Sequence, residues 1–320
     1  MTLILVTGST GTAGTAFKKI FTQFEKYQFY FIGSRDCNLT NFEDTLNFLQ
    51  KNSPNFVIHL ASVSGGIGIS LKYPATVLKD NLLMNLNILE ACRLSNVEKV
   101  IMTLSSGMYP KDSPNPLKEE YIHLGNPHPS NYSYAFAKRL VDPLIKSYRE
   151  EYGLNAIGLI PNGIYGENDC FNLDDANMLA ALIRRFYENK NNDKDIIVWG
   201  DGSPLREYTY SEDIARAYMW CLENYNNEQI LNIGSIEEKS VKDIAYMVAE
   251  MMNIDNNRIK FDISKPSGQY RKSTDNNRFV SLSNFNYTPF KIGLSKTIEW
   301  FIKSYEDTPD ILRYNSKIGH

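Results

Sequence analysis

The sequence predicts an α/β fold in which a doubly wound parallel sheet is joined to a second, smaller α/β part. Three observations predict it. Short apolar runs alternate with helical patterns through the first half of the chain, a glycine-rich turn follows the first of these runs, and the alternation loosens beyond Pro161. In sheets of this kind, ligands bind at the carboxyl ends of the strands.

Five apolar runs are expected to form the buried strands of the sheet. They lie at residues 3–6, 28–32, 56–60, 99–104 and 156–160. Long helical patterns at 74–94 and 133–152 lie between them. His59 falls inside the third run and is interpreted as a core histidine.

The second half of the chain is expected to form a substrate-binding domain. The boundaries that we expect are 1–165 for the first domain and 166–320 for the second. A strand at 207–210, a helix at 211–223 and a strand at 230–233 are expected to return to the first sheet, so that 207–235 rejoins the first domain. Ser240 is a candidate N-cap of the helix that follows it.

Composition excludes several classes of function. The 320 residues carry a formal net charge of −3, which gives no reason to expect a nucleic acid partner. No apolar run approaches the length of a membrane span, and the amino-terminal run lacks the basic leader of a secretory signal. The four cysteines are far apart and form no C-x-x-C. We therefore expect a cytoplasmic protein with neither disulfides nor a metal site.

A strand-turn-helix unit near the amino terminus predicts a dinucleotide site. Gly8, Gly11 and Gly14 form a G-x-x-G-x-x-G turn between the first apolar run and a helix. Glycines at this point let a pyrophosphate approach the backbone and lie at the N-terminus of the helix. The turn therefore predicts a Rossmann-type nucleotide site.

The residues after the second strand indicate NADP rather than NAD. Gly33 and Ser34 are neutral, and Arg35 is basic. An acidic residue here would bind the ribose of NAD, whereas an arginine accommodates the 2′-phosphate of NADP. Asp36 follows directly and weakens this argument, and Arg35 could equally be a solvated loop residue.

A Tyr-x-x-x-Lys pair, Tyr134 and Lys138, is the candidate catalytic motif. On a helix this spacing places both side chains on one face, about 5–6 Å apart at Cβ. The ammonium is expected to lower the pKa of the phenol from about 10, so that the pair acts as an acid or base near neutrality. A second such pair, Tyr287 and Lys291, contains Pro289 and is interpreted as structural.

The glycine turn, a serine at the end of the fourth strand and the Tyr-x-x-x-Lys helix resemble the extended short-chain dehydrogenase/reductase family. Within it, the chain resembles the GDP-L-fucose synthases over its whole length. The matching segments are 59–61, 65–67, 105–106, 109–110, 125–131, 134–138, 169, 171–172, 183–185, 198–200, 206–207, 261–266 and 271–272. The resemblance implies NADPH as cofactor and a GDP-4-keto-6-deoxyhexose as substrate, with epimerisation at carbons 3 and 5 before reduction of the 4-ketone.

The resemblance also implies roles for single residues. Tyr134 would donate a proton to the ketone oxygen as hydride arrives, Ser105 would hydrogen-bond the same oxygen, and Lys138 would tune Tyr134 and hold the nicotinamide ribose. The implied cofactor-binding residues are Gly8, Thr10, Gly11, Arg35, Asn38, Leu39, Leu60, Ala61 and Lys138. The implied substrate-binding residues are Ser106, Gly107, Asn177, Arg185, Trp199, Arg206 and Lys272.

The chain departs from that family at the two residues that epimerise the sugar. Gly107 stands where the family has Cys, and Asn177 stands where it has His. Neither residue exchanges protons usefully, and one positioned acid or base is worth about 10²–10⁴-fold. We therefore expect a 4-keto reductase without 3,5-epimerase activity, unless Cys170 replaces the missing thiol.

A second departure concerns the sugar pocket. Where the family has Pro-Thr-Asn, this chain has Pro161, Asn162 and Gly163, and Cys170 replaces the usual Asn. A reshaped pocket would fit a GDP-linked 4-keto heptose as well as a 6-deoxyhexose. In some relatives, separate proteins carry out the epimerase and reductase steps in making capsule heptoses. By analogy, an upstream dehydratase and a separate epimerase would supply the sugar for capsule or surface glycans. The resemblance also implies a homodimer.

Other readings stay open from the sequence. The chain could be a bifunctional GDP-L-fucose synthase with relocated acid-base groups. A 4,6-dehydratase would need an Asp-Glu pair at Ser106 and Gly107. A 4-epimerase would hold NAD tightly, which Arg35 opposes. An inactive nucleotide-binding scaffold is opposed by the complete Ser-Tyr-Lys set.

Overall fold

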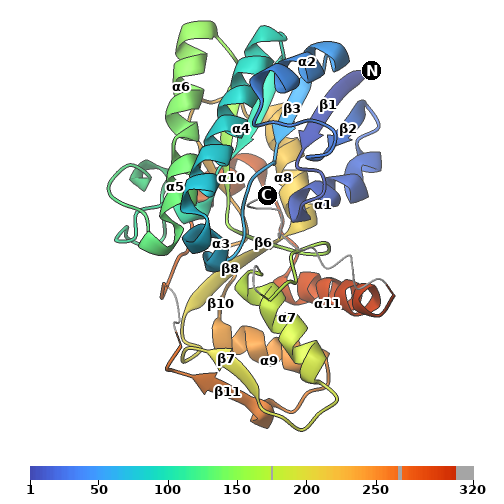
Figure 1. Ribbon diagram of the computed structural model, residues 1–320, viewed down its shortest axis with the longest axis vertical. Coiled ribbons are helices and arrows are strands. Elements are labelled where there is room, and N and C mark those ends of the chain that lie inside the picture. The colour runs from blue at the N-terminus through green and yellow to red at the C-terminus, as the bar shows by residue number, and fades with distance from the viewer. Residues whose placement is uncertain (174–175, 266–268, 308–320) are drawn as a thin grey trace.

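A six-stranded parallel sheet forms the centre of the larger part of the molecule (Figure 1). The computed structural model describes residues 1–173, 176–265 and 269–307. In sheet order, the strands are β2 (Tyr27–Ile32), β1 (Thr2–Thr7), β3 (Phe56–His59), β4 (Lys99–Thr103), β5 (Ala156–Pro161) and β9 (Leu231–Ile233). The chain reverses its direction across the sheet between β1 and β3, where ligands bind in doubly wound folds.

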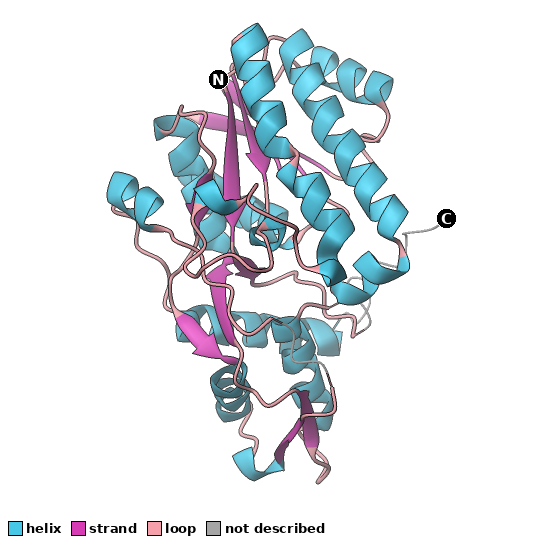
Figure 2. Cartoon of the chain, turned by 90° about the vertical axis from the view of Figure 1, so that its left-hand side faces the viewer, coloured by secondary structure: helices cyan, strands magenta, loops and turns pink. Residues whose placement is uncertain are grey.

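Helices cover both faces of this sheet (Figures 1 and 2). One face carries α1 (Thr12–Ile20) and α8 (Ser211–Asn224), and the other carries α2 (Phe42–Asn52), α4 (Pro74–Leu94), α5 (Tyr132–Arg139) and α6 (Val141–Tyr152). Shorter helices lie in the connections: η1 (Phe21–Gln23), α3 (Ile67–Lys72), η2 (Ser106–Met108), η3 (Glu119–Tyr121) and η4 (Pro129–Asn131). The fold class predicted from the sequence is confirmed.

Two hydrophobic cores lie on either side of the sheet because side chains alternate along a strand. In β1, Leu5 joins the core that contains Ile88 of α4. Its neighbours Ile4 and Val6 face the opposite core, which contains Phe17 of α1. All five of these side chains are fully buried. The apolar run at the start of the chain therefore serves both layers.

The second part of the molecule has its own core and two small sheets. One sheet has the order β10 (Glu238–Ser240), β8 (Leu205–Tyr210) and β6 (Gly163–Tyr165), and the other pairs β11 (Ile259–Asp262) with β7 (Ile196–Trp199). Its helices are α7 (Met178–Asn189), α9 (Val241–Met251) and α11 (Phe290–Asp307), with η5 (Asn256–Arg258) beside α9, whereas α10 (Asn277–Ser283) contacts β9. Ser240 caps α9 in a capping box, as expected.

The strand expected at 207–210 does not return to the large sheet. This strand, β8, pairs with β6 and β10 instead, and only α8 and β9 return. The reason is aromatic packing, since Tyr208 and Tyr210 of β8 contact Tyr165 of β6, and Phe290 packs on Tyr165 and Tyr208. The two domain boundaries stay a prediction.

The helix expected at 133–152 is two helices, α5 and α6, which meet at Leu140. Pro143 explains the break. Proline has no N–H, so it cannot donate to the carbonyl of Arg139, and its ring disfavours a continuous helix at that turn. The catalytic motif therefore lies on a short helix of its own.

The described residues were searched for membrane-spanning helices and for metal sites. None of their helices is long and apolar enough to cross a membrane. Within the same ranges, no cluster of three or more His, Cys, Asp and Glu side chains could hold a metal ion. Cys37, Cys92, Cys170 and Cys221 are buried thiols.

The turn between β1 and α1 requires glycine at its first position. Gly8 has a φ of +67°, and a Cβ there would lie 2.6 Å from the backbone nitrogen of Ala61. Gly14 is equally tight, because a Cβ would overlap the carbonyl oxygen of Gly8. The N–H of Gly11 donates to that carbonyl at 3.0 Å. Glycine is therefore needed in this turn because other backbone lies directly against it.

We expect Gly8→Ala to destabilise the fold more than Gly153→Ala. Both glycines have a φ of +67°, but a Cβ at Gly153 meets nothing within 4 Å. Gly153→Ala should cost about 1–2 kcal/mol of unfolding free energy for the left-handed backbone alone. Gly8→Ala should cost about 1–3 kcal/mol more, because its Cβ overlaps Ala61. Urea denaturation measures both, and equal losses would contradict this account.

Candidate functional site

Ser105 and Tyr134 meet at the carboxyl end of β4. Ser105 lies two residues beyond the strand and caps η2, where its Oγ accepts a 3.1 Å hydrogen bond from the N–H of Gly107. Tyr134 lies on α5, and the side chains of Ser105 and Ser62 are close enough to its hydroxyl to oppose the rise of its pKa by hydrogen bonding. Two hydroxyl groups from neighbouring strand ends thus converge on the phenol.

Lys138 lies one turn along the same helix and is buried, with 1% of its surface exposed. Its Nζ donates to the carbonyl oxygen of Thr103 at 2.9 Å and lies 5.9 Å from the ring centre of Tyr134. Burial disfavours the ammonium and lowers the pKa of Lys138 to about 8. The structure therefore brings the three predicted catalytic residues together.

The pKa of Tyr134 differs from the sequence expectation. Burial raises it, and the hydrogen bonds with Ser62 and Ser105 only oppose that rise. We expected Lys138 to lower this pKa, but desolvation of the phenol is the larger effect. A raised pKa keeps the phenol protonated near neutrality, as a proton donor requires.

Ser62 is a site residue that the sequence analysis missed. It follows β3 as Ser105 follows β4, and its Oγ donates to Oδ1 of Asn81 at 3.0 Å. The amide nitrogen of Asn81 donates to the carbonyls of Val63 and Val77, which fixes its oxygen toward Ser62. Carboxyl ends of adjacent parallel strands meet at one edge of a sheet. That rule could have singled out Ser62.

The predicted cofactor residues lie along this edge. Gly8 packs on Ala61, and Thr10 is next to Gly33, where a Cβ would lie 3.3 Å from Cγ2 of Thr10. The N–H groups of Leu60 and Ala61 both donate to Oγ1 of Thr7 at 3.2 Å. Backbone contacts therefore hold the strand ends around the glycine turn.

The loop after β2 separates its basic residue from its acidic residue. Oδ2 of Asp36 accepts a 2.7 Å hydrogen bond from the N–H of Gly33, whereas Arg35 is exposed. Further along, Oδ1 of Asn38 accepts from Thr40, and Leu39 is buried. An exposed arginine beside an occupied carboxylate suits a 2′-phosphate better than a ribose hydroxyl.

His59 is a core residue, as the sequence analysis proposed. Its side chain is fully buried and shares a 2.8 Å hydrogen bond with Thr7. Burial, and then the charge of Lys138, lowers the pKa of His59 to about 3. The imidazole is therefore neutral at physiological pH, which suits a structural group.

Five of the seven predicted substrate residues form two pairs and a separate residue. The guanidinium of Arg185 lies 5.3 Å from the ring centre of Trp199, which is 50% exposed. Burial, and then the charge of Arg206, lowers the pKa of Lys272 to about 8. Asn177 is exposed and precedes α7. A stacking surface and two neighbouring cations are what an anionic nucleotide requires.

Lys272 also reaches the catalytic group. Its Nζ lies 3.6 Å from the point where a Cβ of Gly107 would be, and Ser105 Oγ lies 3.3 Å from the same point. Ser106 and Gly107 both belong to η2, which Ser105 caps. The geometry therefore joins the cation of the second part to the end of β4.

The side chain of Asn162, in the altered Pro-Asn-Gly stretch, is buried and makes its hydrogen bonds within the protein. Its amide nitrogen donates to Ser235 and Glu207, and its oxygen accepts from Thr209. Glu207 in turn accepts two 2.9 Å hydrogen bonds from Thr274. Burial raises the pKa of Glu207 to about 7. This network holds the chain next to Lys272, and Asn162 lies within it.

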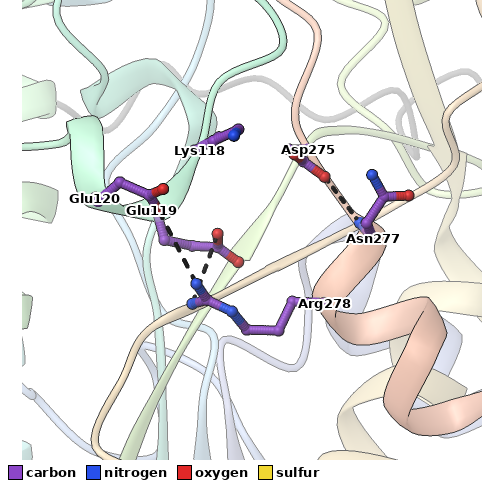
Figure 3. Close-up of a pocket in the computed structure, with 6 residues that line it drawn as sticks. All are labelled: Lys118, Glu119, Glu120, Asp275, Asn277 and Arg278. Carbon is purple, nitrogen blue, oxygen red and sulfur yellow. Dashed lines mark hydrogen bonds and ion pairs between the residues drawn. The ribbon is translucent and has the colours of Figure 1, made fainter.

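A hollow elsewhere is lined by charged residues that belong to a structural seam (Figure 3). The carboxylate of Glu119 is 3.7 Å from Arg278 and accepts from the N–H of Asn232. Asp275 accepts from the N–H of Asn277. These contacts tie η3 to β9 and α10, and none of the predicted site residues lines the hollow.

Comparison with known proteins agrees with this geometry. The sequence profile of the NAD dependent epimerase/dehydratase family matches residues 4–234. A GDP-L-fucose synthase of Dictyostelium discoideum is 37% identical over 308 residues, 95% of this chain and 96% of that protein.

Two solved structures are similar throughout. A GDP-L-fucose synthetase from Naegleria fowleri bound to NADP is 35% identical with a TM-score of 0.90, over 96% of this chain and 94% of that chain. A GDP-mannoheptose C4 reductase from Campylobacter jejuni with NADP bound is 26% identical with a TM-score of 0.83, over 94% and 98%. The resemblance stated from the sequence is confirmed.

Glu207→Gln should flatten the pH dependence of stability. Because the pKa of Glu207 is raised from 4.5 to about 7 by folding, the folded protein binds more protons between these values. Stability should fall as pH rises through that window, by at most about 1.4 kcal/mol per pH unit. Urea denaturation at pH 5 and pH 7.5 measures this, with the exposed Glu25→Gln as control. Identical slopes in Glu207→Gln and the unsubstituted protein would contradict it.

Proposed function

Because the chain belongs to the NAD dependent epimerase/dehydratase family, as a GDP-L-fucose synthase-like extended short-chain dehydrogenase/reductase, we propose that it is an NADPH-dependent 4-keto reductase of a GDP-linked sugar. The convergence of Ser105 and Ser62 on Tyr134, with Lys138 buried beside it, carries this proposal. Such a set donates a proton to an oxygen on which negative charge develops.

The residues of the chain divide the reaction among them. When bound, NADPH supplies the hydride. Tyr134 gives its phenolic proton to the ketone oxygen, and Ser105 donates a hydrogen bond to the same atom. Lys138, whose Nζ donates to the carbonyl of Thr103, lies one helical turn after Tyr134 and would bind the nicotinamide ribose. The turn at Gly8 would receive the pyrophosphate.

The guanosine diphosphate end would lie on the second part of the molecule. Arg185 and Trp199 would bind it by charge and stacking, and Arg206 with Lys272 would bind its phosphates. Arg35 would accommodate the 2′-phosphate of the cofactor, as its exposed position allows. The NADP-bound relatives support this cofactor.

We propose further that the enzyme does not epimerise carbons 3 and 5. Gly107 offers no proton-exchanging group, and the amide of Asn177 does not titrate. Cys170, the alternative thiol, is 8% exposed. An upstream dehydratase and a separate epimerase would then prepare the sugar. The buried thiols suit the cytoplasm, and α4 with α6 would form a homodimer face.

Two candidate sugars follow from the relatives. The side chain of Asn162 is hydrogen-bonded inside the protein, which supports a sugar pocket different from that of the Pro-Thr-Asn pattern. The C4 reductase of a GDP-mannoheptose supports a heptose for capsule or surface glycans. The 37% identity with a GDP-L-fucose synthase favours the second candidate function, a bifunctional epimerase and reductase of a 6-deoxyhexose.

An assay in D₂O distinguishes the two functions. The protein is mixed with NADPH and GDP-4-keto-6-deoxymannose, with and without a separate 3,5-epimerase, while NADPH oxidation and product mass are followed. We expect NADPH oxidation with no deuterium at carbons 3 and 5 unless the epimerase is added. Solvent deuterium in the product of this protein alone would establish the bifunctional enzyme instead. The same assay is repeated with a GDP-4-keto heptose. NADPH oxidation with the heptose and none with the 6-deoxyhexose would identify the heptose as the substrate.

Tyr134→Phe should lower kcat by about 10²–10⁴-fold, because it removes the proton donor and keeps the ring. NADPH binding, measured by fluorescence titration, should be unchanged. Tyr132→Phe is the matched control, since Tyr132 lies on the same helix and is 53% exposed. Unchanged turnover in Tyr134→Phe would refute the role of the phenol.

A further inference from the structure

Three polar atoms surround one point beside Gly107. At the position that a Cβ of residue 107 would take, Nδ2 of Asn131 is 2.7 Å away, Oγ of Ser105 is 3.3 Å away and Nζ of Lys272 is 3.6 Å away. The three come from η4, the end of β4 and the segment after β11. All three groups can donate a hydrogen bond.

The amide of Asn131 is held in a fixed direction. The hydroxyl of Ser70, a buried residue on α3, donates to its Oδ1 at 3.2 Å. With the oxygen occupied by Ser70, the amide nitrogen is directed to Gly107. Within residues 1–173, 176–265 and 269–307, no acceptor for this nitrogen is found. A donor held in this direction beside a reactive centre is suited to a ligand.

Gly107 is what leaves this place open. Any larger residue would put its Cβ 2.7 Å from the amide nitrogen of Asn131 and force that amide away. Gly107 has an ordinary backbone, so the need for glycine is one of space and not of φ. The same point adjoins Ser105, to which we assigned the ketone oxygen. Because Gly107 has no Cβ, a substrate group on the carbon next to that ketone can approach the amide of Asn131.

In a 4-keto sugar, carbon 3 is such a neighbour and carries a hydroxyl. We propose that Asn131 is a specificity-determining residue that donates a hydrogen bond to the 3-hydroxyl of a GDP-4-keto sugar, and that Gly107 keeps the place for it. Lys272, which would also bind the nucleotide phosphates, lies near the same point, and its positive charge favours an oxygen there. This inference rests on the proposed function and narrows its substrates to 3-hydroxy sugars, as opposed to 3-deoxy sugars.

The test compares two substrates, GDP-4-keto-6-deoxymannose and its 3-deoxy analogue. We expect the unsubstituted enzyme to prefer the 3-hydroxy sugar by about tenfold in kcat/KM, which corresponds to one hydrogen bond. Asn131→Ala should lower kcat/KM for the 3-hydroxy sugar by about tenfold and leave the 3-deoxy sugar unchanged. Gly107→Ala should act in the same direction.

Two matched variants serve as controls. Ser130→Ala changes the preceding residue, whose hydroxyl bonds His128, and Gly125→Ala adds a Cβ only 3.4 Å from Pro110, an ordinary contact. Neither should alter the preference between the sugars. Asn131→Ala losing activity equally on both sugars would mean a structural role, and the proposal would be wrong.

Binding separates this inference from the proposed function. Calorimetry with NADP present gives the Kd of GDP-6-deoxymannose and of its 3-deoxy analogue, and needs no turnover. We expect the 3-hydroxy sugar to bind about tenfold more tightly, and Asn131→Ala to remove that difference. Equal Kd values for the unsubstituted protein would overturn the inference. Absence of NADPH oxidation with both ketones, alongside the expected Kd values, would refute only the reductase.

Discussion

The site depends on one buried ammonium, that of Lys138. A charged group taken out of water must find hydrogen bonds, and the carbonyl of Thr103 supplies one. This contact fixes α5 to the end of β4, and Tyr218 of α8 donates to the hydroxyl of Thr103 from the other face of the sheet. The same exclusion of water lowers the pKa of Lys138 and raises that of Tyr134. Desolvation therefore sets both protonation states.

In the second part of the molecule, the buried carboxyl of Glu207 holds a site segment in place by hydrogen bonds, as Lys138 does in the first part. Glu207 holds Thr274 through two hydrogen bonds, and Lys272 lies two residues before Thr274. The ammonium of Lys272 is thereby presented to the end of β4 near Gly107. The site forms where α5, held by the buried Lys138, meets the segment of Lys272 and Thr274, held by the buried Glu207. Each anchor is buried, so each position is fixed by hydrogen bonds that water cannot replace.

The sequence predicted what local patterns determine. Apolar runs located the strands, glycine spacing located the nucleotide turn, and Ser240 located a helix start. Pro143 could have predicted the helix break, but the long amphipathic pattern concealed it. The pairing of β8 could not be predicted, because it depends on Tyr165 from a distant segment. The contact of Ser62 with Tyr134, and the direction of the phenol pKa, arise only when separate strand ends come together.

The break between α5 and α6 has a consequence for how the chain can diversify. Because Pro143 interrupts the helix, α5 and α6 are two helices and not one continuous rod. Its outer end, where Tyr152 is 47% exposed, belongs to the surface. Tyr134 is positioned by α5, which packs on α4 and contacts η2. Apart from the proposed homodimer face, we expect substitutions at the outer end of α6 to affect the proton donor less than substitutions on α5 would.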